Sequence, residues 1–350
     1  MNTNSDRLPT ISVILPVYNE GRNLHAVVHS LLQQQTSTPG AEFNLEILVI
    51  DGLSTDGSVD TLRKETLHDP RVSFLTNEKR KTPFAFNMGL RESRGEFVAI
   101  LGSHNQYLPD YLAVCLAELR SHDAIGCSGR VISHPPNPSL SAKLAAAVSS
   151  HKFGSSGRSF RTQPQGFADT IPYPVFRRQA LLDVGGYDES LHRNQDNDMN
   201  ERLRRAGHRL YCTWLTSSLY HTQPTLTALC RYAWRNGYWN IVSLRKNAAS
   251  MSLRHFIPLL FVLSILIGVL VAGAGFALLP AEFKIFAWLP LAAVFGLYLL
   301  CASLASIDLA VKQRSFAPLF LPPAFLAFHI SYGLGSIQAM LNGGREPVEG

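Results

Sequence analysis

The sequence predicts an α/β fold, a mostly parallel sheet with helices on both faces, followed by an all-α membrane region of about three helices. Apolar, β-rich runs alternate with amphipathic helical patterns through the first part of the 350-residue chain. Such alternation is typical of a parallel sheet covered on both sides. Charge is unevenly distributed: residues 256–341 contain five charged side chains, whereas 50 of the remaining 53 precede residue 256.

The alternation can be followed element by element. Strands are predicted over 11–18, 45–51, 71–77 and 95–102, and helices over 21–35, within 54–67, and over 83–93 and 109–120. Polar residues follow the first two strands in "PVYNEGRN" and "DGLSTDG", where ligands of parallel sheets bind. Neither G-x-G-x-x-G nor a P-loop follows a predicted strand, so nicotinamide-dependent and P-loop functions lose their main support.

Three apolar stretches form the predicted membrane region, at 256–279, 285–307 and 316–341, before a polar tail at 342–350. Each has the twenty or so residues needed to cross a bilayer, without an internal charge. The third contains Pro318, Pro322 and Pro323, so a kinked or partly re-entrant segment fits it too.

Charges around these stretches predict an orientation. The N-terminus is polar and shows no signal peptide, and the segment 231–255, which we expect to be a basic interfacial helix, carries four arginines, one lysine and no acid. Lys312 and Arg314 lie between the second and third stretches. The positive-inside tendency then predicts a multi-pass protein of the inner (plasma) membrane with residues 1–230 in the cytoplasm, and a C-terminus outside if the third stretch crosses.

The net charge of +6 fits attraction to anionic lipid head groups and to a diphosphate. Nucleic acid is not expected as a partner, because no recognition motif accompanies the charge. The five cysteines are odd in number and show no paired spacing, which indicates reduced thiols and no zinc site.

"SVILPVYNEGRNL" followed by "ILVIDGLSTDGS" resembles the nucleotide-binding half of the inverting glycosyltransferases of family 2, which have a GT-A fold. The stretch from "GFADTIPYPVF" through "NQDNDMNERLRRAG" to "RYAWRNGYWN", then the membrane tail, is similar to the ExoA-like, succinoglycan-type exopolysaccharide glucosyltransferases of that family. The resemblance covers about residues 10–260. It implies a membrane-bound enzyme that moves a hexose, glucose by resemblance, from a UDP-sugar to a lipid-diphosphate-linked saccharide acceptor, with other polysaccharide-assembly proteins as further candidate partners.

The resemblance also implies contacts to the sugar nucleotide. Taken alone, "PVYNE" would be a turn and a helix cap, Asp51-Gly52 a common turn, and Asp56 a cap for a helix beginning near Ser58. Carried over residue by residue, the expected nucleotide-sugar contacts are Pro16, Tyr18, Glu20, Asp51, Asn87, Ser103 and His104.

The acid-x-acid pair with which the family holds a metal falls on Gly102-Ser103-His104. ExoA-like sequences tend to carry His in the last place but keep the first Asp, which is absent here. His104 could bind a divalent cation, Mg²⁺ or Mn²⁺, although magnesium prefers oxygen ligands and one imidazole is a weak site. Alternatively, His104 donates a hydrogen bond or a positive charge to the diphosphate, or caps the helix that starts near Pro109.

"NQDNDMNERLRRAG" (194–207) is the candidate catalytic motif. Helical spacing puts Met199 and Leu203 on one face and Asp196 near the N-terminus, where a carboxylate is stabilised. By resemblance, Asp196 is the base that takes the acceptor's hydroxyl proton, with Asp198 as support or as a solvent-facing acid. A capped amphipathic helix with a basic exposed face is the structural alternative.

Three more residues are candidates for the diphosphate or the acceptor: His221, Arg231 and Arg235. The arginines are four apart and share a helix face, and they could neutralise the leaving diphosphate or a lipid diphosphate. The alternative is an interfacial helix anchored by Trp234, Tyr238 and Trp239. The Gly/Ser-rich stretch 151–161 is expected to be a flexible loop near the acceptor.

Two other functions stay open. A polyprenyl-phosphate sugar synthase would use the lipid phosphate itself as acceptor, and a catalytically inactive scaffold would keep the fold only to bind sugar nucleotide. The absent Asp at position 102 favours the scaffold, and the intact "QDND" favours an enzyme.

Overall fold

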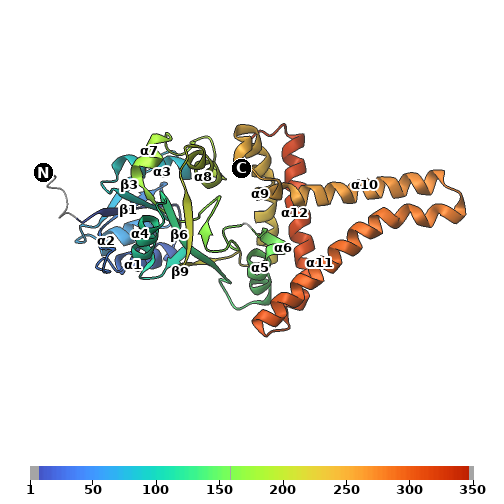
Figure 1. The fold of residues 1–350 in the computed structure, drawn as a ribbon, viewed down its shortest axis with the longest axis horizontal. Helices are drawn as coiled ribbons and strands as arrows, with labels where there is room; N and C mark the ends of the chain where they lie inside the picture. Colours follow the sequence, from blue (N-terminus) through green and yellow to red (C-terminus); the bar gives the residue numbers. More distant parts are fainter. Residues whose placement is uncertain (1–7, 158, 347–350) are drawn as a thin grey trace. The chain divides into compact units, whose positions relative to one another are not determined.

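The computed structural model describes residues 8–157 and 159–346. The chain forms two compact units (Figure 1). The first comprises the chain up to Ile132 together with Gln163–His221, and the second comprises Ser133–Thr162 together with the chain from Thr222 onward. Each unit therefore contains two separate stretches of sequence.

The first unit is built on a nine-stranded sheet with the order β3-β2-β1-β4-β8-β6-β9-β5, and β7 pairs with β9. Strands β1 to β4 pair in parallel, whereas β4 with β8, β8 with β6, and β9 with β5 and β7 pair antiparallel. The predicted mostly parallel α/β sheet is confirmed as a mixed sheet, in which the pairs described beyond β4 are antiparallel. The strands are β1 (Thr10–Val17), β2 (Asn44–Asp51), β3 (Val72–Thr76), β4 (Phe97–Ile100), β5 (Asn105–Tyr107), β6 (Gly126–His134), β7 (Gly166–Phe167), β8 (Val175–Arg177) and β9 (Leu210–His221).

Helices cover both faces of this sheet. They are α1 (Arg22–Leu32), α2 (Ser58–Glu65), α3 (Thr82–Glu92), α4 (Tyr111–Ser121), α7 (Arg178–Asp183) and α8 (Gln195–Arg205). Alternate residues of β1 point to opposite faces: Val13 and Leu15 pack with α1, α2 and α4, whereas Ile14 packs with α3, α7 and α8. All three side chains are fully buried, which fixes the register of the central strand.

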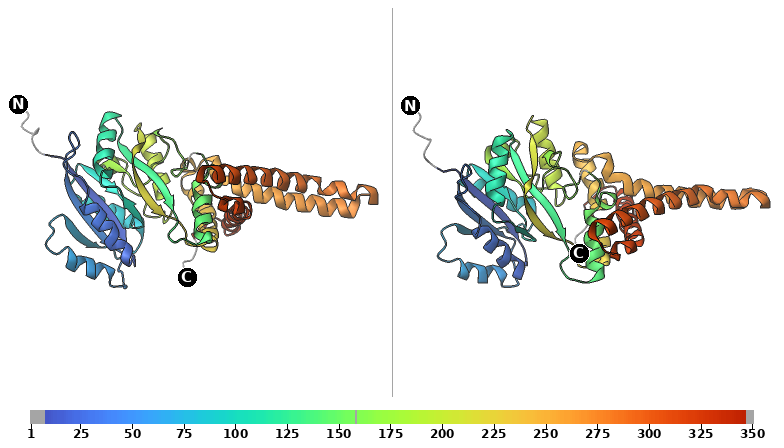
Figure 2. Two further views of the ribbon diagram at one scale, coloured as in Figure 1. Left: turned by 90° about the horizontal axis from the view of Figure 1, so that it is seen from below. Right: turned by 60° about the horizontal axis from the view of Figure 1, so that its bottom comes forward.

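The second unit is helical. It contains α5 (Leu140–Ser150), α6 (Lys152–Ser155), α9 (Leu226–Lys246), α10 (Ile257–Leu278), α11 (Leu289–Gln313) and α12 (Leu321–Leu341), with short 3₁₀ turns η1 (Ala248–Ser250), η2 (Leu253–Phe256), η3 (Ala281–Trp288) and η4 (Ala317–Phe320). Figure 2 shows α10 and α11 as a long hairpin. Among the described residues, three helical segments are long and apolar enough to cross a membrane: 253–278, 281–313 and 318–341.

Some predicted features of this unit differ in detail. The third apolar stretch is one continuous helix from Leu321, because Pro322 and Pro323 lie in its first turn, where proline is tolerated. The predicted basic helix begins earlier, at Leu226, and ends at Lys246. Tyr238 and Trp239 are buried inside the unit and are not surface anchors. The stretch 151–161 begins with the short helix α6, and Arg158 lies outside the described residues.

Candidate active site

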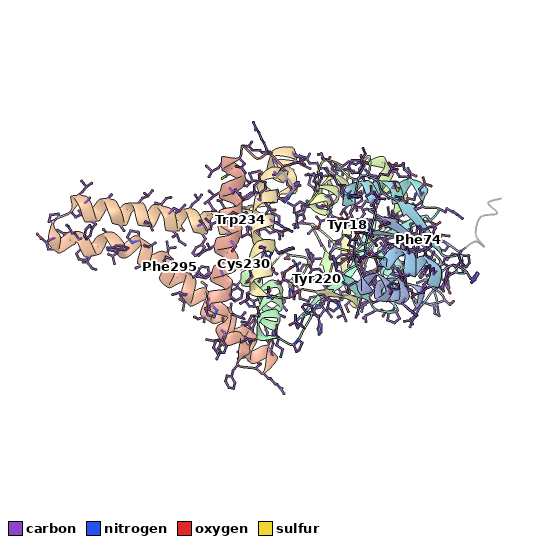
Figure 3. All side chains as sticks on the ribbon, turned by 180° about the vertical axis from the view of Figure 1, so that it is seen from behind. Tyr18, Phe74, Tyr220, Cys230, Trp234 and Phe295 are labelled. Atoms are coloured by element: carbon purple, nitrogen blue, oxygen red, sulfur yellow. The ribbon has the colours of Figure 1, made fainter. Side chains whose placement is uncertain are left out.

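The loops after β1, β2 and β4 emerge at one edge of the sheet. These strands are parallel neighbours, and the register pairs Val17 with Asp51 and Ile14 with Ile100. Ligands of open α/β sheets bind at this edge. Tyr18, which follows β1 directly, is half exposed there (Figure 3).

Side chains tie the first two of these loops together. The backbone N–H of Asn19 donates to Ser54 Oγ (3.0 Å), and that of Thr55 donates to Asn19 Oδ1 (2.8 Å). The backbone N–H of Gly21 donates to Asp56 Oδ2 (2.8 Å). Asn19 and Gly21 both adopt positive φ, so the "YNEG" loop has one defined shape.

The two acids of the second loop act mainly on the loop itself. Asp56 Oδ1 accepts from the hydroxyl and the backbone N–H of Ser58 (2.6 and 3.1 Å), the first residue of α2, whereas the N-cap of this helix is Gly57 and not Asp56. These hydrogen bonds hold the pKa of Asp56 below its usual value. Asp51 Oδ1 accepts from the backbone N–H of Ser54 (2.9 Å), and Asp51 is half-buried at the end of β2.

The structure brings Glu20 and His104 together from different loops. Glu20 Oε2 lies 3.2 Å from His104 Nδ1, and the His104 side chain is 62% exposed, whereas that of Glu20 is 11% exposed. Glu20 thus lies beside one ring nitrogen of an imidazole that is mostly exposed to solvent. His104 does not cap α4, whose N-cap is Asp110 and lacks a side-chain cap.

Gly102 fits between two tyrosines. The Tyr107 hydroxyl accepts from the Gly102 N–H (2.8 Å) and donates to the Gly102 carbonyl (3.2 Å). A Cβ placed on Gly102 would lie 3.0 Å from Tyr173 Cε1, closer than ordinary carbon contacts. Ser103, the middle residue of the motif, is buried. An aspartate at position 102 would therefore require Tyr173 to move.

These residues do not fit a protein-held divalent cation. The acid-x-acid positions supply no carboxylate, and the one imidazole among them is already beside Glu20. No three His, Cys, Asp or Glu side chains converge as metal ligands anywhere in residues 8–157 and 159–346. Magnesium and manganese prefer several oxygen ligands held close together, and positions 102–104 contribute no carboxylate to such a set.

His221 joins the same region through strand pairing. Asn105 on β5 pairs with Tyr220 on β9 in antiparallel register. Extending that register by one residue sets His104 opposite His221. His104 and His221, 117 positions apart in sequence, are thus the neighbours of a paired position in the sheet.

Helix α8 presents one acid to solvent and buries two. Asp198 is 3% exposed and pairs with Arg202 (2.8 Å), and Glu201 is 5% exposed and pairs with Arg205. Asp196, in the first helical turn, is exposed, and its Oδ1 accepts from the backbone N–H of Asn197 (2.9 Å). Asp198 is therefore not a solvent-facing acid, and its supporting role stays a prediction.

Tyr187 lies beside this carboxylate. Burial is the main cause that raises the pKa of the Tyr187 hydroxyl above its usual value, and the negative charge of Asp196 raises it further. Tyr187 therefore stays neutral. Asn87 holds its backbone: Oδ1 accepts from the Tyr187 N–H (2.7 Å), and Nδ2 donates to the Tyr187 carbonyl (2.8 Å) and to Glu189 Oε1 (3.0 Å). Gly186 has a φ of +74°, and a Cβ there would lie 2.7 Å from Asn87 Oδ1. Asn87 thus positions the loop before α8, and its predicted contact to the sugar stays a prediction.

Arg231 and Arg235 belong to the second unit. Both are exposed and one turn apart on α9. Trp234 is 36% exposed, and its indole N–H donates to Gln338 Oε1 (2.7 Å). The shared face expected from the spacing of the arginines is confirmed.

Sequence reasoning missed Tyr107, Tyr173 and Tyr187. Each is a single aromatic residue outside any motif. Tyr107 contacts Gly102, which is five positions away, whereas Tyr173 and Tyr187 contact residues far away in the sequence, Gly102 and Asn87. Only the "GGYD" turn, with two glycines at positive φ, marked the position of Tyr187 as unusual.

Comparison with known proteins identifies the family of the chain. The model of glycosyl transferase family 2 matches residues 12–185. The succinoglycan biosynthesis protein ExoA of Rhizobium meliloti (strain 1021) is 30% identical over 261 residues, which cover 73% of this chain and 77% of that protein. A dolichyl N-acetyl-alpha-D-glucosaminyl phosphate 3-beta-D-2,3-diacetamido-2,3-dideoxy-beta-D-glucuronosyltransferase of Methanococcus voltae is 24% identical over 341 residues, 95% of this chain and 98% of that one.

Among solved structures, the mannosyltransferase PcManGT from Pyrobaculum calidifontis, in complex with GDP-Man and Mn²⁺, matches with a TM-score of 0.56 at 18% identity, over 97% of this chain and 91% of that one. That likeness concerns the fold, and the family follows from the sequence matches. The chain belongs to glycosyltransferase family 2 and has the GT-A fold.

Proposed function

We propose that this protein is an inverting glycosyltransferase that transfers a hexose from a UDP-sugar to a lipid-diphosphate-linked acceptor at the cytoplasmic face of the inner membrane. Glucose is the donor sugar that we favour, and exopolysaccharide biosynthesis is the pathway class. The name of the Rhizobium relative supports the pathway. The membrane-length helices support a lipid-linked acceptor.

The observation that carries the proposal is the contrast among the acids of α8, a helix that is fully described. Asp198 and Glu201 are buried and neutralised by arginines, whereas Asp196 is exposed at the helix N-terminus. A general base must reach the proton of an incoming hydroxyl, which only an accessible carboxylate can do. A scaffold that merely bound sugar nucleotide would have no need of such a group.

In the proposed reaction, Asp196 accepts the proton of the acceptor hydroxyl while that oxygen forms a bond to the anomeric carbon. The bond from the anomeric carbon to the UDP oxygen breaks on the opposite side, so the configuration inverts. UDP departs with the bonding electron pair. No covalent bond to the enzyme is formed.

The departing diphosphate needs positive charge or hydrogen-bond donors. His104, which lies beside Glu20, and His221 are our candidates for this task at the sheet edge. Preorganised donors of this kind stabilise charge that develops in a transition state. Because the donor set does not fit a protein-held metal, we assign this task to the side chains. A divalent ion, if one takes part, would have to find most of its ligands on the diphosphate and water. Separately, we propose that Arg231 and Arg235, both exposed on α9, contact the lipid diphosphate of the acceptor.

The acceptor is the least constrained partner. The Methanococcus relative is named for a dolichyl-linked sugar phosphate, so a lipid monophosphate sugar is a second acceptor to be tested. A bare polyprenyl phosphate is the third, as for a polyprenyl-phosphate sugar synthase. The common requirement is a lipid carrying a phosphate, and the assay separates the three by product analysis.

The deciding experiment replaces Asp196 by asparagine in the full-length protein, purified into lipid. UDP release from UDP-glucose is measured with a polyprenyl-diphosphate-galactose acceptor. Loss of the base should lower kcat by roughly 10²–10⁴-fold, with UDP-glucose binding unchanged. Asp60→Asn is the matched control, because Asp60 is also an exposed acid in the first turn of a helix, α2. If Asp196→Asn turned over normally, the assignment of the base would be wrong.

A further inference from the structure

The three membrane-length helices are not equivalent. We compared the most apolar 18-residue stretch of each segment. The share of this stretch that is buried inside the protein is 44% for the α12 segment, 28% for the α10 segment and 17% for the α11 segment. The α12 segment is also the least apolar of the three. These differences raise the question of which helices cross the bilayer.

Helix α12 lies against α9 with almost no space between the backbones. A Cβ on Gly237 of α9 would fall 2.0 Å from the carbonyl oxygen of Tyr332, and a Cβ on Gly335 of α12 would fall 2.1 Å from that of Trp234. Ser336 Oγ donates to the carbonyl of Gly237 (3.0 Å). Small residues on both helices permit this approach.

The contact extends along both helices, which run in the same direction (Figure 1). Near their N-termini, Leu229 of α9 shares a buried cluster with Leu321 and Phe325 of α12. Near their C-termini, Lys246 pairs with Glu346 (2.6 Å), and the Tyr238 hydroxyl donates to the carbonyl of Arg345 (2.9 Å). The two helices must therefore share one environment.

That environment is not the hydrocarbon core. Arg231 and Arg235 lie in the first half of α9 and are exposed, and Arg245 and Lys246 are exposed at its end. Charged side chains at the bilayer centre are among the costliest groups to insert, whereas they suit the anionic head-group layer. If α12 crossed the bilayer, it would take the arginines of α9 into the hydrocarbon with it.

Helix α10 meets α12 through its first turns, and α11 meets α12 along its C-terminal half, from Tyr298 to Leu309. Gly333 packs on Pro258 and Val262 in the first turns of α10, and Tyr298 of α11 bonds to His329 (OH to Nδ1, 2.8 Å). Away from these contacts, large apolar side chains of the hairpin are exposed, among them Leu270, Phe276, Phe283, Trp288 and Leu289. Figures 1 and 2 show that the hairpin of α10 and α11 extends away from α9 and α12, across the direction in which those two helices run.

The hairpin has the dimensions and the charges of a two-helix span. The 22 residues of α10 extend about 33 Å, close to the hydrocarbon thickness of a bilayer. Its tip carries Glu282 and Lys284, and its open end carries Arg254, Lys312 and Arg314. The basic end belongs on the cytoplasmic side.

We propose that only α10 and α11 cross the membrane, that α12 lies beside α9 in the cytoplasmic head-group layer, and that the C-terminus is on the cytoplasmic side. This differs from the external C-terminus expected if all three stretches cross. The inference concerns the membrane topology alone and does not depend on the donor, the acceptor or the base.

The test uses full-length protein in its cell membrane, with Cys230 and Cys301 changed to serine, because the other three cysteines are buried. One variant adds Glu282→Cys at the hairpin tip, and the other adds a cysteine after Gly350. A membrane-impermeant maleimide is applied to spheroplasts before and after permeabilisation. We expect Glu282→Cys to be labelled in intact spheroplasts and the C-terminal cysteine only after permeabilisation.

Every other pattern overturns the proposal. Labelling of both cysteines from outside would mean three crossings. Labelling of neither would mean that the hairpin does not cross, and labelling of the C-terminal cysteine alone would reverse the orientation.

A charge scan provides an independent measurement. Leu334→Lys, at an exposed position in the middle of α12, is expected to leave the yield of membrane-inserted protein within about twofold, since a lysine at the head-group layer reaches water. The matched variant Ile267→Lys, in the middle of α10, should lower that yield roughly fivefold or more. Equal losses in the two variants would contradict an interfacial α12.

Discussion

Replacing Asn87 by alanine should destabilise the first unit and slow the reaction at once. The side chain makes three hydrogen bonds, of 2.7, 2.8 and 3.0 Å, and two of them hold both backbone groups of Tyr187, which is 5% exposed. At roughly 1 kcal/mol net for each bond, the free energy of unfolding should fall by about 3 kcal/mol. For a unit of this size the apparent melting temperature should drop by about 6–12 °C.

The effect on activity separates two roles for Asn87. Because Tyr187 lies beside Asp196, a loosened loop should lower kcat and leave KM for the UDP-sugar nearly unchanged. Thermal unfolding followed by intrinsic fluorescence, together with UDP-release kinetics on the same preparation, measures both quantities. Asn44→Ala is the control, since Asn44 is exposed and makes one 3.3 Å bond to the Leu8 carbonyl. An unchanged melting temperature with a raised KM would refute the positioning role and restore the predicted sugar contact.

Two further predictions concern charge. Transfer should persist when divalent ions are chelated. It should fall by about tenfold or more in His104→Ala, because the imidazole beside Glu20 takes the place of the missing acids. UDP release with and without EDTA tests this, and loss of wild-type activity on chelation would contradict it. Arg202→Leu leaves the buried Asp198 carboxylate without its guanidinium and should cost about 3 kcal/mol of stability, which a second change, Asp198→Leu, should largely restore. Denaturation of the single and double variants gives the answer, and equal stability of wild type and Arg202→Leu would show that the pair is unimportant.

The parallel half of the sheet was predictable because each strand is a continuous apolar run followed by a helical pattern. β1 to β4 all lie within a few residues of their predicted positions. The antiparallel half was not predictable, since β5, β7 and β8 have only two or three residues and so show no periodicity. Nor did any sequence feature indicate that residues 133–162 pack with the C-terminal helices, because that pairing depends on contacts between segments far apart in the chain.

The position of a site residue could be predicted from the sequence where it depends only on residues close to it in the chain. Asp56 bonds to Ser58 at the start of α2, although Gly57 is the N-cap, and Asp196 is exposed in the first turn of α8, as expected. The Glu20–His104 pair joins residues 84 positions apart and has no local signal. For Asn87, the family resemblance predicted that the position matters, but only the structure reveals that its side-chain amide holds the loop before α8.

The division of the second unit has a consequence for synthesis on the ribosome. Helix α5 is translated between β6 and β7, yet its apolar residues, such as Leu144 and Val148, are covered by α9, α11 and α12. The last of these helices begins roughly 175 residues later in the chain, a delay of about 10–35 s at common rates of elongation. During that time the nascent chain must keep an apolar helix from aggregating. Targeting the ribosome to the membrane before α10 emerges would shorten this exposure.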